Sequence, residues 1–192
     1  MIKEPLNLDN KDREILSLLE KNPELSQKEI STKIGLSQPS VSARLYKLKK
    51  KGVLSFTVGV NFKKVNLYLA KVDVSANNTL DILNIFKDCP YFLNGLITSG
   101  KNNLCLFFAG EDITTLEAIV DGHLRNHPYI KNVDLSIVIS PFKDLIFPLK
   151  MSFIKKEVNP CHTNCDACPY FTSERCLGCP ILDCYKGELW KE

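Results

Sequence analysis

Start and stop signals for three short helices fall within residues 9–54, and they leave this part of the chain few ways to fold. Pro23 ends the first helical pattern. Ser26 and Glu29 form the capping box S-x-x-E that opens a second helix, and Gly35 occupies the position where a left-handed residue ends it. A third helix follows at once. The pattern therefore predicts two compact helices, a tight glycine turn and a third helix.

The third helix has an apolar side and a polar side. Val41, Leu45 and Leu48 recur at i, i+4 and i+7, so they are expected to face the core. The opposite side is polar near its start and cationic further along. A recognition helix in the major groove places base contacts and phosphate contacts in this way. The residues expected to contact DNA are Gln38, Ser40, Ser42, Arg44, Lys47 and Lys51.

Positive charge is concentrated at the N-terminal end of the chain. Residues 1–64 contain 13 Lys and Arg against 7 Asp and Glu, whereas residues 65–192 contain 12 against 15. A basic segment joined to a nearly neutral body favours a polyanionic partner. The alternative is a generic three-helix domain with a solvated lysine face. Because the caps, the turn and the charge agree on one surface, double-stranded DNA is the preferred partner.

After Gly52, the segment Val53–Asn61 alternates as a short hairpin or wing would. Residues 8–54 resemble the winged helix-turn-helix of the leucine-responsive/asparagine regulators, the Lrp/AsnC family. The resemblance extends over about residues 6–145 and implies a DNA-binding transcription regulator that assembles as a homodimer or a higher oligomer. The matching landmarks are Leu8, Asp9, Asp12, Ile15, Leu16, Ser26, Gly35, Leu36, Ser37, Val41, Arg44, Leu48, Gly52, Val53 and Leu54.

The middle of the chain alternates between strand and helix patterns. A strand, a helix, a hairpin of two strands, a second helix and a last strand make the order βαββαβ, which is the ferredoxin-like arrangement. The Lrp/AsnC resemblance separately implies this fold for a dimerisation and effector domain. In the first of these helices, Leu80, Leu83 and Phe86 are expected to face inward. The segments expected to form these elements are 67–76, 79–90, 91–100, 102–110, 112–128 and 133–142.

The resemblance also implies an amino-acid effector site near the hairpin turn of this domain, at residues 98–104. The candidates there are Gly100, Asn102 and Asn103. The family has a glycine followed closely by an acidic residue, but this chain has Gly100-Lys101-Asn102-Asn103. An ammonium group would therefore lack its obvious partner. An amino-acid-responsive regulator is accordingly the second choice.

Four other side chains in the middle of the chain could take part in metal chemistry. His123 and His127 lie four residues apart on the second expected helix, a spacing that can chelate a metal, but no carboxylate or cysteine partner is visible in the sequence. Surface or capping roles are expected for both. Cys89 and Cys105 have apolar neighbours and are expected in the core. No catalytic constellation emerges, so the chain is not expected to be an enzyme.

Six of the eight cysteines fall within residues 161–184, in the pattern C-x3-C-x2-C-x7-C-x2-C-x4-C. The pattern contains two C-x2-C hooks, and Cys168 and Cys179 each precede a proline, as cluster-ligating cysteines do in ferredoxin-type segments. A [4Fe–4S] cluster held by four thiolates is preferred. A structural Zn(Cys)4 site would leave two cysteines unexplained, and a metal-free thiol–disulfide switch is the third alternative. The candidate ligands are Cys161, Cys165, Cys168, Cys176, Cys179 and Cys184.

Together these patterns predict an α+β chain with a winged helix-turn-helix over 1–62, a ferredoxin-like domain over 63–150 and a cysteine-rich module over 151–192. The sequence shows no signal peptide and no membrane span, so we expect a cytoplasmic protein whose thiols stay reduced. The cysteine-rich module has too little apolar material to fold alone, and metal bonds are expected to order it.

The preferred function is a transcription regulator whose DNA binding depends on an iron–sulfur cluster. One alternative is an amino-acid-responsive regulator with a structural zinc tail. The alternative from another class is a redox or electron-carrier protein with no operator. The basic side of the third helix argues against the electron carrier, which has no need of Arg44, Lys47 and Lys51 in line.

Overall fold

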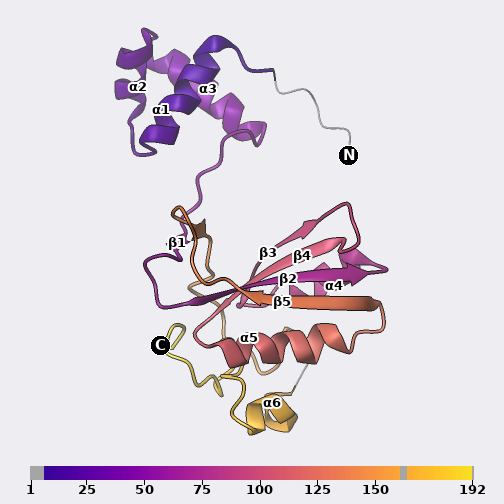
Figure 1. The fold of residues 1–192 in the computed structure, drawn as a ribbon. Helices are drawn as coiled ribbons and strands as arrows, with labels where there is room; N and C mark the ends of the chain where they lie inside the picture. The colour runs from indigo at the N-terminus through magenta and orange to yellow at the C-terminus, as the bar shows by residue number, and fades with distance from the viewer. Residues whose placement is uncertain (1–6, 161–163, 192) are drawn as a thin grey trace. The chain divides into compact units, whose positions relative to one another are not determined.

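The computed structural model describes residues 7–160 and 164–191 and divides the chain into two compact units, Met1–Thr57 and Val58–Glu192 (Figure 1). The first is the helical unit. The second, the sheet unit, also contains the cysteine-rich tail, which the sequence predicts as a module of its own over 151–192. The tail is therefore part of the sheet unit.

The helical unit follows its start and stop signals closely. Helices α1 (Asn10–Lys21), α2 (Gln27–Ile34) and α3 (Gln38–Lys50) are each opened by a capping side chain, and the predicted capping box of α2 makes both of its hydrogen bonds. Gly35 ends α2 at φ 67°, a left-handed conformation that costs glycine little. The predicted three-helix core is confirmed. Its buried residues are Ile15, Leu19, Ile30, Ile34, Val41 and Leu45.

The hairpin predicted over Val53–Asn61 is not formed within that segment. Only β1 (Val60–Asn61) is a strand, and it pairs antiparallel with β6 (Ile146–Phe147), far along the chain. An isolated two-stranded hairpin is marginal in water, whereas β6 offers a partner whose Phe147 already packs in the sheet unit. Gly59 permits the close approach, because a Cβ there would lie 2.8 Å from the backbone oxygen of Phe147.

Four antiparallel strands in the order β3-β4-β2-β5 form the main sheet. Two helices, α4 (Thr79–Phe86) and α5 (Ile113–Val120), connect them, and α5 continues as a π-helical turn, η1 (Asp121–Arg125). This is the predicted βαββαβ order, so the ferredoxin-like arrangement is confirmed (Figure 1). The strands are β2 (Tyr68–Ala76), β3 (Phe92–Ile97), β4 (Leu104–Gly110) and β5 (Ile130–Ile137).

The inward face of α4 is predicted correctly at two of three positions. Phe86 is buried and Leu83 packs against the core, but Leu80 is 62% exposed and Ile82 is buried instead. The segment has apolar residues at successive positions, so its periodicity allows two neighbouring faces to point inward. Packing against Phe108 on β4, whose ring centroid lies 5.0 Å from that of Phe86, selects between them.

Aromatic residues of the tail enter the core of the sheet unit. Beyond the short helix α6 (Pro169–Thr172), Tyr185 and Trp190 are 8% and 4% exposed. The indole of Trp190 packs edge-on against Tyr91, with 5.3 Å between ring centroids, and its Nε1 donates a hydrogen bond to the backbone oxygen of Lys150 at 2.6 Å. Packing on the sheet unit thus contributes to the order of the tail, and the further ordering by metal bonds stays a prediction.

A single carboxylate holds the last turns of the tail. Glu111, which follows β4, accepts hydrogen bonds from the hydroxyl of Tyr185 and from the backbone N–H groups of Glu188 and Leu189, the latter two at 2.8 Å. Burial, and then the bond to Glu111, raise the pKa of Tyr185 well above its usual value, so the hydroxyl remains a donor. Because hydrogen bonds to a charged acceptor are the strong ones, Glu111 is the main polar anchor of the tail.

Glu111→Ala is expected to loosen the tail while the sheet stays folded. The amides of Glu188 and Leu189 lose a charged acceptor worth roughly 1.5–3 kcal/mol, so their hydrogen exchange should be about tenfold faster or more. Hydrogen–deuterium exchange of the full chain measures this. Glu117→Ala is the matched control, because among the described residues Glu117 reaches the tail only through an exposed ion pair to Arg175 at 3.8 Å. Equal exchange in the two variants would show that the Glu111 carboxylate does not hold the tail.

Candidate nucleic-acid interface and cysteine-lined cavity

The outer side of α3 presents the residues predicted to contact DNA. Ser37 caps the helix by accepting from the backbone N–H of Ser40. In the part of the chain that the structure describes, the ammonium groups of Lys47 and Lys51 form no ion pair with the protein, so both cations are available to phosphates. The DNA contacts themselves stay predictions. Exposed members of this set are Gln38, Ser42, Lys47 and Lys51, while Ser40 is half-buried.

Arg44 has a different environment from the rest of that side. Its Nη1 donates to Asp9 Oδ2 at 2.6 Å and to Asp12 Oδ1 at 2.7 Å. Asp12 is 5% exposed and Asp9 caps α1, so the ion pairs tie the middle of α3 to the first turn of α1. Hydrogen bonding to Arg44 lowers the pKa of Asp9. Arg44 therefore positions the recognition helix within the unit, and its contact with DNA stays a prediction.

Arg44→Ala is expected to destabilise the helical unit at neutral pH, because the buried carboxylate of Asp12 loses its partner. Folding lowers the pKa of Asp9 from 3.8, so the stabilisation is present above that value and is lost as the pH falls through the folded pKa. The difference in melting temperature from wild type should therefore be largest near neutral pH and shrink below about pH 4. Calorimetry measures it, with the exposed Lys47→Ala as control. A difference that stays constant down to about pH 3 would contradict the ion-pair role.

An asparagine ties the turn between β3 and β4 to the end of β2. Asn103 Oδ1 accepts from the N–H of Ala76 at 2.9 Å, and its Nδ2 donates to the backbone oxygen of the same residue at 2.8 Å. Asn102 Nδ2 lies 3.4 Å from the carboxylate of Asp134, while its Oδ1 is buried without a hydrogen-bond partner among the described residues. Gly100 has φ 151°. Asn103 is thus structural, and an effector site formed by Gly100, Asn102 and Asn103 stays a prediction.

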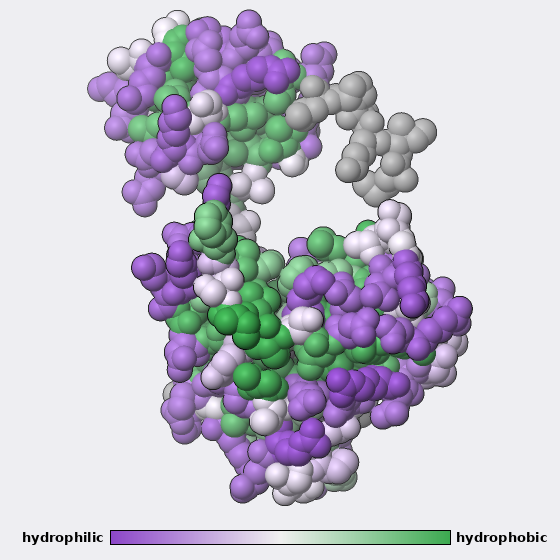
Figure 2. Space-filling view, in the orientation of Figure 1, coloured by the Kyte–Doolittle hydropathy of each residue, from purple (hydrophilic) through white to green (hydrophobic). Residues whose placement is uncertain are grey.

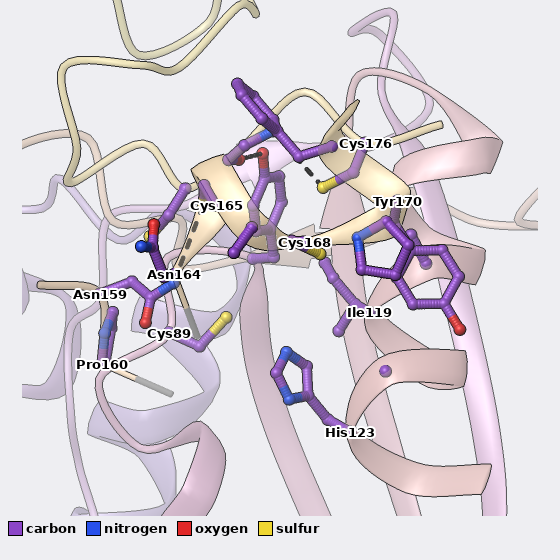
Figure 3. A pocket seen from close by; sticks show the side chains of 18 of the residues that line it. Cys89, Ile119, His123, Asn159, Pro160, Asn164, Cys165, Cys168, Tyr170 and Cys176 are labelled. Carbon is purple, nitrogen blue, oxygen red and sulfur yellow. Dashed lines mark hydrogen bonds between the residues drawn. The ribbon is translucent and has the colours of Figure 1, made fainter. Parts of the chain in front are cut away.

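The cysteines of the tail meet at a cavity of about 370 Å³, which lies between the tail and the helices that cover the sheet (Figure 3). Four predicted ligands line it, namely Cys165, Cys168, Cys176 and Cys179. The two C-x2-C hooks, whose relative position the sequence does not fix, therefore face one space. We call this space the thiol cavity.

Local structure directs N–H groups at two of these sulfurs. The first hook begins with a 3-10 turn, η2 (Cys165–Ala167), and the buried Asn159 donates from Nδ2 to Cys165 Sγ at 3.8 Å. In the second hook, Gly178 has φ 85°, and its N–H donates to Cys176 Sγ at 3.4 Å. Such donors favour the thiolate, which is the form that binds metals.

The thiols are close enough to influence one another's ionisation. Burial is the largest cause of the raised pKa of Cys176, the N–H of Gly178 opposes it, and the nearby Cys165 and Cys168 add to it. Several thiolates gathered in an apolar space repel one another, and a bound cation removes that cost. Without a bound cation, the raised pKa therefore favours the neutral thiol of Cys176.

One predicted ligand that the structure describes, Cys184, does not line the thiol cavity. Cys184 lines a second cavity, of about 540 Å³, to which Cys165 also contributes. Burial, and then the adjacent Cys165, raise the pKa of Cys184 to about 11. Cys161 lies outside the described residues. The seven described cysteines are thiols rather than disulfides.

Two residues that the sequence assigns to structural roles also line the thiol cavity, namely Cys89 and His123. His123 lies on η1 and packs edge-on against Phe86, with 6.0 Å between ring centroids, and burial lowers its pKa. His127 points elsewhere, because its Nδ1 accepts from the N–H of Tyr129 at 3.3 Å. The i, i+4 spacing of the histidines therefore reflects two separate environments.

In the described part of the chain, no group of three or more His, Cys, Asp or Glu side chains is arranged to hold a metal ion. Binding of an iron–sulfur cluster or of zinc by the cysteines of the tail therefore stays a prediction.

Comparison with known proteins finds a family model that matches the helical unit and solved structures with a similar fold. Residues 8–55 match the family described as winged helix-turn-helix DNA-binding. The transcriptional regulator AzlB of Bacillus subtilis is 29% identical over 71% of this chain and 91% of its own length. The structure of LrpC from B. subtilis has a TM-score of 0.58 and 26% identity, over 72% of this chain and 99% of LrpC. That of AsnC from E. coli has a TM-score of 0.61 and 18% identity, over 71% of this chain and 95% of AsnC.

The winged helix-turn-helix and the exposed recognition helix define a DNA-binding transcription regulator, not an enzyme. The relatives of this chain are named transcriptional regulators, and its sheet unit has the fold of the solved structures of LrpC and AsnC, so the chain is similar to regulators of the Lrp/AsnC type. Across the described ranges, the structure contains no helix with the length and apolar character needed to cross a membrane.

Proposed function

We propose that an iron–sulfur cluster, most simply [4Fe–4S], sets the affinity of this regulator for its operator and is held by cysteines of the tail. The observation that supports this most directly is the convergence of Cys165, Cys168, Cys176 and Cys179 on one cavity of about 370 Å³. When bound, such a cluster supplies a core that responds to iron supply, oxygen and redox state. The N–H donors at two of the sulfurs are the kind of contact that stabilises and tunes ligating thiolates.

Hydrogen bonds connect the second hook, which lines the thiol cavity, to the helices and strands of the sheet unit. Within the second hook, the N–H of Leu177 donates to Thr115 Oγ1 on α5 at 2.9 Å, and the backbone oxygen of Gly178 accepts from the Tyr91 hydroxyl at 2.6 Å. Filling or emptying the cavity therefore acts on residues bonded to α5 and to the start of β3. Regulation requires that this change favour one arrangement of the DNA-binding units over another.

The proposed DNA-binding form is a homodimer or a higher oligomer, which presents α3 of each helical unit to the duplex. Self-association is supported by apolar side chains left exposed on the sheet unit: Ile139 and Phe142 are each 94% exposed and Ile146 is 60% exposed. Figure 2 shows hydrophobic residues gathered on the visible face of that unit. Contiguous apolar surface of this kind marks interaction sites in soluble proteins.

Lys47→Ala and Lys51→Ala are expected to weaken DNA binding for all sequences alike. Each should reduce the slope of log affinity against log salt by about one for every phosphate that the variant no longer neutralises. Gln38→Ala and Ser40→Ala should instead reduce the preference for the operator over random DNA and leave the slope unchanged. Fluorescence anisotropy over a range of salt concentrations separates the two effects. Wild-type affinity and slope in the Lys47→Ala, Lys51→Ala double variant would exclude α3 as the interface.

Cluster-loaded and cluster-free protein are expected to bind the same operator with affinities that differ about 5–150-fold, the usual range of coupling between sites. Cys165→Ser and Cys168→Ser should each abolish cluster assembly and fix the affinity at the cluster-free value. Iron, sulfide and zinc contents of protein purified without oxygen, together with anisotropy on operator DNA, test this.

Cys184→Ser is the matched control for these variants, because Cys184 lines the second cavity and not the thiol cavity. It should retain its iron and its regulated binding. A colourless, zinc-loaded wild type would replace iron by zinc as the occupant. Equal DNA affinity with and without the cluster would make the centre structural and remove the regulatory role.

A further inference from the structure

The sheet unit contributes a thiol of its own to the thiol cavity. Cys89 lies in the turn between α4 and β3 and lines the cavity together with the four cysteines of the two hooks (Figure 3). Its neighbours in the sequence are apolar, which is why the sequence predicts a core residue there. In the fold, however, it is only half-buried and is one of five thiols around the same space.

The turn that contains Cys89 is held in a fixed position. The backbone N–H of Cys89 donates to the oxygen of Phe86 at 3.0 Å, and its backbone oxygen accepts from the N–H of Phe92 at 3.2 Å. Two residues further, the Tyr91 hydroxyl donates to the backbone oxygen of Gly178 in a buried bond of 2.6 Å. The turn is thus bonded directly to the loop between Cys176 and Cys179, and its thiol is preorganised for the same centre.

The local sequence of Cys89 matches that of two hook cysteines. Cys89 precedes Pro90, as Cys168 precedes Pro169 and Cys179 precedes Pro180. Proline after a ligating cysteine is a feature of ferredoxin-type cluster segments. The dipeptide is short and carries little weight alone. Together with the shared cavity and the fixed turn, it gives Cys89 the context of a ligand.

We propose that Cys89 is a ligand of the metal centre in the thiol cavity, so that the centre bridges the sheet unit and the tail. The iron–sulfur identity of the centre rests on the function proposed above, whereas the ligand role of Cys89 does not. A [4Fe–4S] core takes four thiolates, so Cys89 and three of the four hook thiols would supply them, while Cys184 lines the second cavity. A centre bound in this way acts directly on the α4–β3 turn.

The test compares Cys89→Ala and Cys89→Ser with wild type in the full chain, each reconstituted with iron and sulfide without oxygen. Cys89→Ala should lose the cluster to a chelator at least about tenfold faster, or fail to assemble it. After reduction with dithionite to the paramagnetic 1+ state, Cys89→Ser should show a cluster with an altered electron paramagnetic resonance spectrum, because an oxygen ligand replaces sulfur on one iron. Cys105→Ala is the control, since Cys105 is buried on β4 and does not line the cavity. It should behave as wild type.

Two outcomes separate the two proposals. Wild type that assembles a cluster, with both Cys89 variants identical to it in spectrum and chelator resistance, overturns the ligand role and leaves the proposed function standing. Wild type that takes up zinc but no iron ends the iron–sulfur proposal. In that case Co²⁺ titration decides the ligand role, because Cys89→Ala should lower the intensity of the thiolate-to-cobalt absorption band and an unchanged band overturns it.

Discussion

Docking of the tail's aromatic rings beside Glu111 is the interaction on which the thiol cavity depends. The thiol cavity has walls from α4 and α5 and sulfurs from the tail, so it exists only while Tyr185 and Trp190 stay buried in the shared core. A metal centre at this place is therefore linked to tail packing. Metal binding favours the docked tail, and a docked tail raises the affinity for metal by preorganising its donors.

Features of the fold that depend on near neighbours in the sequence are predicted well, whereas features that depend on a distant partner are not. Caps, the glycine stop at Gly35 and alternating patterns decide the helices and strands locally, so the helical core and the βαββαβ order follow from them. The prediction of a wing over Val53–Asn61 is wrong because the strand partner of β1 is β6, which follows the ferredoxin-like segment in the sequence. The prediction for α4 is wrong at Leu80 for a related reason, because packing on the sheet buries Ile82 and leaves Leu80 exposed.

The candidate sites also contain some features that the sequence predicts and others that it does not. Spacing alone identifies the two cysteine hooks and the outer side of α3. It does not show that Arg44 pairs with Asp9 and Asp12, which lie 35 and 32 residues away. Spacing also gives no indication that Cys89 lines the thiol cavity, because only the folded chain brings the α4–β3 turn to the tail. Helical periodicity predicts that a side chain is exposed, but the identity of its partner is a tertiary property.

The bond between Tyr91 and Gly178 joins residues 87 positions apart, and this separation sets an order of events during synthesis. The α4–β3 turn leaves the ribosome well before the cysteine hooks, and N-terminal elements fold first. The sheet can therefore form while the cavity still lacks most of its sulfurs. During that interval the nascent thiols are open to oxidation and to whichever metal reaches them first. If the cavity holds the proposed centre, its loading would depend on the metal and oxygen that the hooks meet when they reach the folded sheet.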